Sequence, residues 1–129
     1  MSRDRRTPPV VGEERGAVTA ELAMSLPLLV AVTIGLVWLL SVGAAQIRAV
    51  DAARETARAV ARGDAVAEAV AVGRRVAPEG AEVTVTRSRG EVVATSRARV
   101  EGPGGLFGFL PAVTVSAEAV AADEDAGVP

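Results

Sequence analysis

A run of 26 residues without Asp, Glu, Lys or Arg, residues 22–47, constrains this chain more than any other feature. A helix rises about 1.5 Å per residue, so roughly 20 apolar residues cross the hydrocarbon core of a bilayer. A buried core helix of the same length would need a larger protein around it than 129 residues supply. The run therefore predicts a single transmembrane helix.

A removable secretory signal is the main alternative to a retained helix. Val42-Gly43-Ala44 resembles a signal-peptidase site, and arginines precede the run. The apolar part of such signals is usually about 7–15 residues long, however, which is shorter than this run. Charge does not fix the orientation, because four arginines flank each end: Arg3, Arg5, Arg6 and Arg15 before the run, and Arg48, Arg54, Arg58 and Arg62 after it.

Composition excludes most enzyme chemistry. The chain has no His and no Cys, which removes imidazole bases, thiol nucleophiles, disulfides and most zinc sites. The sequence contains no phosphate-binding loop and no GxSxG pattern. A net charge of −2 with no basic block gives no reason to expect nucleic acid binding. We therefore expect no enzymatic activity, no cofactor, no metal and no small-molecule substrate.

The residues just before the apolar run carry a family resemblance. Gly16 is followed by four uncharged residues and then by Glu21, which opens the run. This order resembles a class III signal sequence, and residues 15–64 resemble the TadE-like minor pilins and pseudopilins of tight-adherence (Tad) type IV pilus systems. The most distinctive parts are Arg15-Gly16-Ala17, Glu21, Pro27 and the sequence RAVDAARETARAVARGD after the run.

The resemblance implies a processing site and a role in assembly. In this family a prepilin peptidase cuts after the glycine on the cytoplasmic side, which here would separate Gly16 from Ala17. The new ammonium at Ala17 of one subunit would then pair with Glu21 of another and register it in a filament. Leu22 stands where the major pilins of these systems usually carry Tyr, which favours a minor subunit.

Glu21 and Pro27 also have plain structural interpretations. A carboxylate near the first turn of an apolar helix is favourable and marks the membrane interface, with Thr19 as the expected N-cap. Pro27 removes the hydrogen bond to the carbonyl of Ala23. It is either a tolerated membrane proline or a kink that helps the helix leave the bilayer.

Beyond the run the helix is expected to continue to Gly63. Its apolar residues recur at three- and four-residue steps and predict one stripe, made of Ile47, Val50, Ala53, Ala57 and Val60. Gly63-Asp64 indicates a stop followed by a new N-cap. Residues 65–77 then predict a second, shorter helix that Pro78 ends, with one side lined by Val66, Val70 and Val76.

Three alternating segments predict strands at residues 82–86, 92–100 and 113–117, with a hairpin turn at Ser88-Arg89-Gly90. A three-stranded antiparallel sheet is the simplest arrangement, and its small inner residues need the helix stripe or another subunit for stability. Residues 102–111 predict an apolar loop. Its large side chains either cap the core or form a contact patch for a partner or the bilayer surface: Leu106, Phe107, Phe109 and Leu110.

Together these features predict an α+β fold in which a long N-terminal transmembrane helix continues outside the membrane. The expected parts are a cytoplasmic leader (1–16), a transmembrane and assembly helix (17–47), an extracytoplasmic helical extension (48–77), a small antiparallel β region (78–122) and an acidic tail (123–129).

The preferred function is a minor pilin-like subunit, held as a single-pass protein of the cytoplasmic (inner) membrane with its N-terminus in the cytoplasm. Its partners would be prepilin peptidase, other pilin and Tad assembly subunits, and membrane lipid. It would enter a surface pilus or only assist assembly. The alternatives are an unprocessed anchor whose outer domain binds an envelope partner, and a small secreted binding protein released by cleavage near Ala44.

Overall fold

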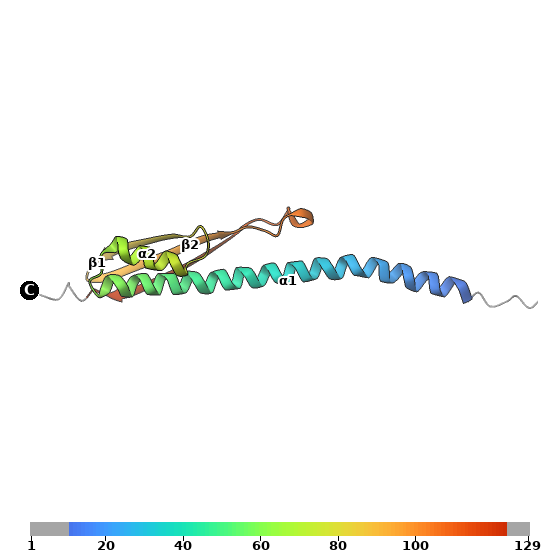
Figure 1. Ribbon diagram of the computed structural model, residues 1–129, viewed down its shortest axis with the longest axis horizontal. Coiled ribbons are helices and arrows are strands. Elements are labelled where there is room, and N and C mark those ends of the chain that lie inside the picture. The colour runs from blue at the N-terminus through green and yellow to red at the C-terminus, as the bar shows by residue number, and fades with distance from the viewer. Residues whose placement is uncertain (1–10, 124–129) are drawn as a thin grey trace, which may run out of the picture. The chain divides into compact units, whose positions relative to one another are not determined.

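The computed structural model describes residues 11–123, except for the side chains of Val11, Glu13 and Leu106. The predicted leader and acidic tail therefore lie partly outside the described residues. The helices are α1 (Val11–Ala61) and α2 (Val66–Val76), with a short 3₁₀ turn η1 at Gly105–Phe107 (Figure 1). The strands are β1 (Glu82–Ser88), β2 (Glu91–Val100) and β3 (Val113–Ala122). This arrangement confirms the predicted α+β fold.

The chain divides into two compact units between Leu36 and Val37, inside α1. The described part of the first unit is helical and keeps its large apolar side chains exposed, such as Leu28 and Leu29 at 67% each. Its hydroxyls are satisfied within the helix, because Thr19, Ser25 and Thr33 each donate a hydrogen bond to the carbonyl oxygen four residues earlier.

The helix begins earlier than the sequence predicted. The N-cap expected at Thr19 is wrong, since α1 starts at Val11 and Thr19 Oγ1 donates to the carbonyl of Arg15, 2.9 Å away. No proline interrupts residues 11–19, so the polar residues before the apolar run continue the helix. Pro27 lies inside α1 without ending it.

The second unit contains a three-stranded antiparallel sheet in the order β1-β2-β3. Ser88 pairs with Glu91, so Arg89 and Gly90 form a two-residue turn. Their φ angles of 52° and 80° lie in the left-handed region that type I′ hairpin turns require. The predicted hairpin is therefore confirmed. The second hairpin closes where Val100 pairs with Val113, and the apolar loop lies between these two residues.

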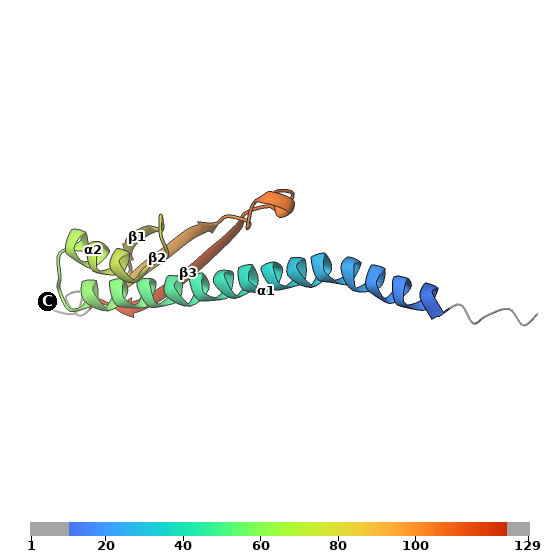
Figure 2. The same ribbon diagram turned by 45° about the vertical axis from the view of Figure 1, so that its right-hand side comes forward.

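One face of the sheet packs on the C-terminal part of α1 (Figure 2). Alternate residues of β2 are buried there, which confirms the predicted alternation: Val92, Ala94, Ser96 and Ala98. One apolar cluster joins Ala45 and Ala49 of α1 to the sheet, and a second cluster joins Ala59 and Val60 to both α2 and the sheet. The core of this unit thus depends on small side chains.

The predicted helix stripe is only partly correct. Ala53, Ala57 and Val60 are buried, but Ile47 is 64% exposed. The smaller residues Ala45, Ala49 and Ala52 are buried instead, because they allow the sheet and α2 to approach the α1 backbone closely.

The second helix turns a different side inward from the one predicted. Val66 and Val76 are 41% and 42% exposed, whereas Ala69 and Gly73 are buried. A Cβ added at Gly73 would lie 3.2 Å from the Ala52 carbonyl oxygen and would overlap the hydroxyl of Thr56. Close approach of two helices therefore selects glycine over valine at this contact.

The N-cap predicted at Asp64 is also wrong. The N-cap of α2 is Ala65, which makes no side-chain capping bond. The Asp64 carboxylate instead lies 3.5 Å from the guanidinium of Arg62.

Candidate membrane span and contact surfaces

Among the described residues, α1 is the one helix long and apolar enough to cross a membrane, on length and composition. The predicted site residues Gly16, Ala17, Glu21 and Pro27 all lie in it and are exposed. The backbone carbonyl of Glu21 accepts a hydrogen bond of 2.8 Å from Ser25 Oγ. The roles of these four residues in cleavage and assembly stay predictions.

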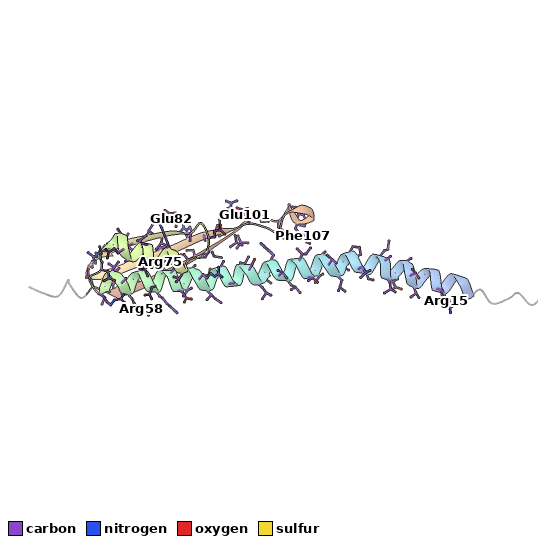
Figure 3. All side chains as sticks on the ribbon, in the orientation of Figure 1. Arg15, Arg58, Arg75, Glu82, Glu101 and Phe107 are labelled. Carbon is purple, nitrogen blue, oxygen red and sulfur yellow. The ribbon has the colours of Figure 1, made fainter. Side chains whose placement is uncertain are left out.

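A hydrogen bond connects the apolar run to the end of β2. The indole Nε1 of Trp38 donates to the backbone carbonyl of Glu101 over 2.9 Å. The carboxylate of Glu101 forms an ion pair with Arg99, whose Nε lies 3.1 Å from Oε1. Both charged side chains are more than two-thirds exposed, at 76% and 71% (Figure 3 labels Glu101). The carbonyl that Trp38 contacts therefore belongs to a residue whose side chain is part of an exposed ion pair.

A second bond of this kind lies two turns further along α1. The side-chain amide of Gln46 donates to the carbonyl of Ser116 in β3 over 3.0 Å. Sequence reasoning missed both bonds, because neither an indole nor an amide in an apolar run identifies its distant partner. The only signal was the presence of these two polar groups within residues 22–47.

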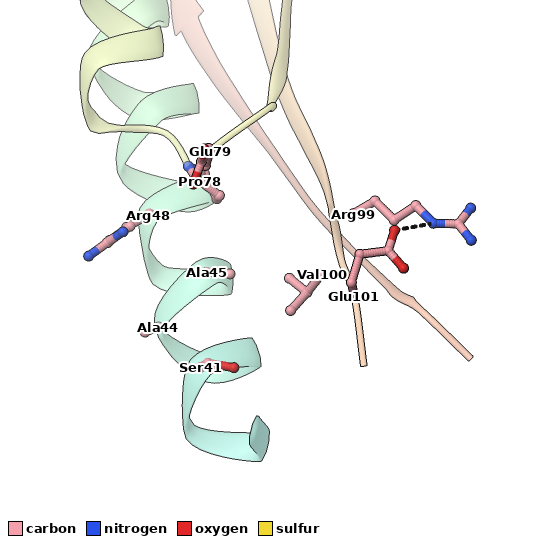
Figure 4. Close-up of a pocket in the computed structure, with 9 residues that line it drawn as sticks. All are labelled: Ser41, Ala44, Ala45, Arg48, Pro78, Glu79, Arg99, Val100 and Glu101. Carbon is pink, nitrogen blue, oxygen red and sulfur yellow. Dashed lines mark hydrogen bonds and ion pairs between the residues drawn. The ribbon is translucent and has the colours of Figure 1, made fainter. Parts of the chain in front are cut away.

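An open groove of about 450 Å³ lies between α1 and the end of β2 (Figure 4). Its lining combines small residues with charged ones: Ser41, Ala44, Ala45, Arg48, Pro78, Glu79, Arg99, Val100 and Glu101. The hydroxyl of Ser41 donates to the carbonyl of Trp38 over 2.6 Å. No imidazole or thiol is present to activate it. The groove therefore offers a mixed surface, mainly apolar with charged groups among its lining residues.

Acidic residues do not gather into a metal site in the described part of the chain, where no three Asp or Glu side chains come together. The ion pairs Arg62–Asp64 and Arg99–Glu101 lie at the surface, whereas in the pair Arg87–Asp123 the Asp123 side chain is only 12% exposed.

The apolar loop of residues 102–111 does not complete the core. Phe109 is 77% exposed, so the prediction that it caps the core is wrong. Phe107 and Leu110 are partly buried and join neither apolar cluster of the described residues. The side chain of Leu106 lies outside the described part of the structure. The two ends of the loop approach each other closely, since a Cβ added at Gly102 would lie 3.1 Å from the Leu110 carbonyl oxygen.

Fold and surface together define a class of protein: a small α+β unit attached to one apolar helix suited to a membrane. Residues 16–58 match the family model of TadE, described as TadE-like protein, which confirms the resemblance seen in residues 15–64. TadE-like proteins are a pilus-related structural family. The match and the apolar helix support a single-pass membrane protein related to Tad pili.

One curated relative is the protein named Apoptosis inhibitor Rv3655c of Mycobacterium tuberculosis (strain ATCC 25618 / H37Rv). It is 42% identical to this chain over 79 residues, which are 61% of this chain. The chain spans 57% of that relative's length, so little more than half of it is compared. No solved structure matches this chain.

Proposed function

We propose that the chain is a minor pilin-like subunit that takes part in Tad-type pilus assembly. Its apolar helix is stored in the cytoplasmic membrane with the N-terminus in the cytoplasm, and prepilin peptidase cuts between Gly16 and Ala17. The helix then packs with the helices of other pilin and Tad assembly subunits. The observation that carries the proposal is the family match, which begins at Gly16 and includes Glu21.

The hydrogen bond from Trp38 to Glu101 supports a limit for the span. An ionised side chain within the hydrocarbon costs several kcal/mol, about 2.5–3.5 at mid-membrane on insertion scales. The exposed Arg99–Glu101 pair beside Trp38 therefore belongs in water or among headgroups. On this argument the hydrocarbon ends near Trp38, and residues 38–47 lie beyond it although they are uncharged.

This limit has a consequence for Glu21. Residues 22–37 would rise only about 24 Å as a helix, which is short of a hydrocarbon core about 30 Å thick. Residues 16–37 would rise about 33 Å and would match it. The matching span therefore contains Glu21 about one and a half turns from its start. A carboxylate at that depth favours a positively charged partner, and the ammonium created at Ala17 of a neighbouring subunit would supply one.

Cleavage is tested by mass spectrometry of the membrane-extracted protein from cells with an active prepilin peptidase. We expect a chain that starts at Ala17. Gly16→Val should leave residues 1–16 attached, whereas the control Gly12→Val, in the same helix with nothing within 4 Å, should be processed normally. An intact N-terminus in the natural protein would contradict the proposal and favour an unprocessed anchor. A soluble chain starting near Ala45 would favour a secreted protein.

The registering role of Glu21 is tested separately by Glu21→Gln, which keeps the size of the side chain and removes its charge. Cleavage should continue, while the number of filaments per cell should fall several-fold. The control Glu14→Gln alters a carboxylate that leaves with residues 1–16 and should have no effect on filaments. Normal filament numbers with Glu21→Gln would show that assembly does not need the pairing of Glu21 with the Ala17 ammonium. The cleavage result would be unaffected.

A further inference from the structure

We propose that the apolar loop, residues 102–111, is a second membrane contact: it inserts Phe107 and Phe109 into the interfacial layer of the leaflet from which α1 emerges. The proposal requires that α1 spans a bilayer and that the span ends near Trp38. It does not depend on cleavage, pilus assembly or Glu21, so it can fail or succeed independently of the proposed function.

Composition makes this loop suited to a bilayer surface. Residues 102–117 contain no Asp, Glu, Lys or Arg, and two of the three aromatic residues of the chain, Phe107 and Phe109, lie within them. An exposed loop in water is normally polar, because its backbone and side chains face solvent. This loop instead exposes 77% of Phe109. The two phenylalanine rings lie together, with centroids 6.4 Å apart and planes inclined at 34°.

Three backbone amides of the loop are paired within the loop itself. The amide of Phe107 donates to the carbonyl of Gly104, that of Gly108 to Gly105, and that of Leu110 to Phe107, at 2.9–3.1 Å. Because unpaired amides are costly near hydrocarbon, this internal pairing lowers the cost of bringing the loop to a lipid surface.

The two ends of the loop meet, so it is a compact projection. A Cβ added at Gly102 would lie 3.1 Å from the carbonyl oxygen of Leu110, which means that the ends cross closely. Figures 1 and 2 show the loop extending beyond the ends of β2 and β3. The rings of Phe107 and Phe109 therefore belong to a compact loop whose two ends are close together.

The position of the loop in the fold favours lipid as the partner that its phenylalanine rings contact. The loop begins directly after Glu101, whose carbonyl accepts the hydrogen bond from Trp38 in the apolar run (Figure 3 labels Glu101 and Phe107). Tryptophan is enriched where a membrane helix meets the headgroups. The loop is thus continuous with the place where the span is expected to end. A loop of ten residues is also small for a stable protein interface, which usually buries more than about 1,000 Å².

The test uses the full chain, which has no natural cysteine, so one nitroxide can be attached at a single introduced cysteine. Phe109→Cys carries the label at the loop. Val120→Cys, which is 57% exposed in β3, is the matched control. Both proteins are reconstituted in vesicles of phosphatidylcholine and phosphatidylglycerol. Power-saturation measurements then compare access by oxygen, which concentrates in lipid, with access by a nickel chelate, which stays in water.

We expect the oxygen-to-nickel accessibility ratio at position 109 to be several times that at position 120. A ratio at 109 equal to or below that at 120 would overturn the proposal. Spectral broadening at 109 that grows as protein is concentrated in the vesicles would also overturn it, because a second copy of the chain would then be the occupant. Phe107→Cys repeats the measurement if the label at 109 alters the circular dichroism spectrum.

Discussion

The two parts of α1 on either side of Leu36 differ in what they bury although they belong to one helix. Before that residue large aliphatic side chains are exposed, such as Leu28 and Leu29 at 67% each. After it Leu39, Leu40 and Ile47 are exposed as well, but small residues become buried, and Ala49 and Ala52 have no exposed surface. The helix therefore exposes its largest apolar groups and buries its smallest.

This contrast indicates two different roles for apolar residues in α1. Large aliphatic side chains gain about 1.5–3 kcal/mol each from leaving water, so the exposed row of them in residues 22–36 favours contact with lipid or with other helices. Alanine gains little from burial, but it allows a sheet and a second helix to approach the backbone. Size thus distinguishes a membrane or assembly surface from an intramolecular packing surface.

A charge placed in each part of α1 should have the largest and most unequal effects. Leu29→Arg should reduce membrane integration, since arginine at the centre of a span costs about 2.5–3.5 kcal/mol on insertion scales. Ile47→Arg should be tolerated, because Ile47 is 64% exposed and lies beyond Trp38. Extraction of membranes with alkaline carbonate measures both. If Ile47→Arg were equally damaging, the span would extend to residue 47 and the limit near Trp38 would be wrong.

Enlarging a buried alanine should have the next largest effect. Ala49→Leu forces three extra carbons into the contact with Ala98 and Val115, and should lower the free energy of unfolding by about 3 kcal/mol, the upper end of the usual cost of overpacking. Ala23→Leu makes the same change at an exposed position of α1 and should leave stability unchanged. Urea titration in detergent, followed by circular dichroism, compares the two. Equal stability of both variants would show that size does not distinguish the surfaces.

A smaller effect is expected where α2 crosses α1. Gly73→Ala should destabilise the protein by about 1–2 kcal/mol, because the new methyl overlaps the Thr56 hydroxyl and disturbs its 2.8 Å bond to the Ala52 carbonyl. Gly43→Ala, with nothing within 4 Å, should instead stabilise α1 by about 0.5–1 kcal/mol. Thermal unfolding shifts of opposite sign would support this difference. A gain in stability from Gly73→Ala would rule out the close crossing.

The smallest effect is expected at the junction between the two surfaces. Trp38→Phe removes the donor to the Glu101 carbonyl and should cost about 0.5–1.5 kcal/mol, the usual net value of one hydrogen bond. Amide hydrogen exchange in residues 99–101 should then become faster, while exchange in residues 82–88 should not change. Unaltered exchange in both segments would mean that the bond does not hold the end of β2.

The periodic parts of the fold were predictable from sequence. Strict alternation in residues 92–100 identified both the strand and its buried side, and Ser88-Arg89-Gly90 identified the hairpin turn. In these segments each side chain has one sheet face or the other, so a period of two leaves little ambiguity.

The helix contacts were harder to predict, because hydrophobicity does not identify which small residue touches a neighbour. An apolar pattern predicts Val66 and Val76 on the inner side of α2, yet Gly73 lies there because Thr56 and the Ala52 carbonyl leave no room for a Cβ. The Trp38–Glu101 bond joins residues 63 positions apart, and no local pattern indicates it. The motif around Gly16 and Glu21 predicted the match to the TadE-like family model without indicating any of these contacts.

The Trp38 contact also gives this protein an intrinsic optical probe. The chain has no Tyr and a single Trp, so its indole fluorescence comes from one position, at the hydrogen bond to Glu101. Loss of that bond, or a move of the indole from lipid to water, changes the polarity around the ring and shifts its emission. The unlabelled natural chain can therefore report, in real time, when the sheet separates from α1, and on the proposed function it would also report the departure of the helix from the bilayer.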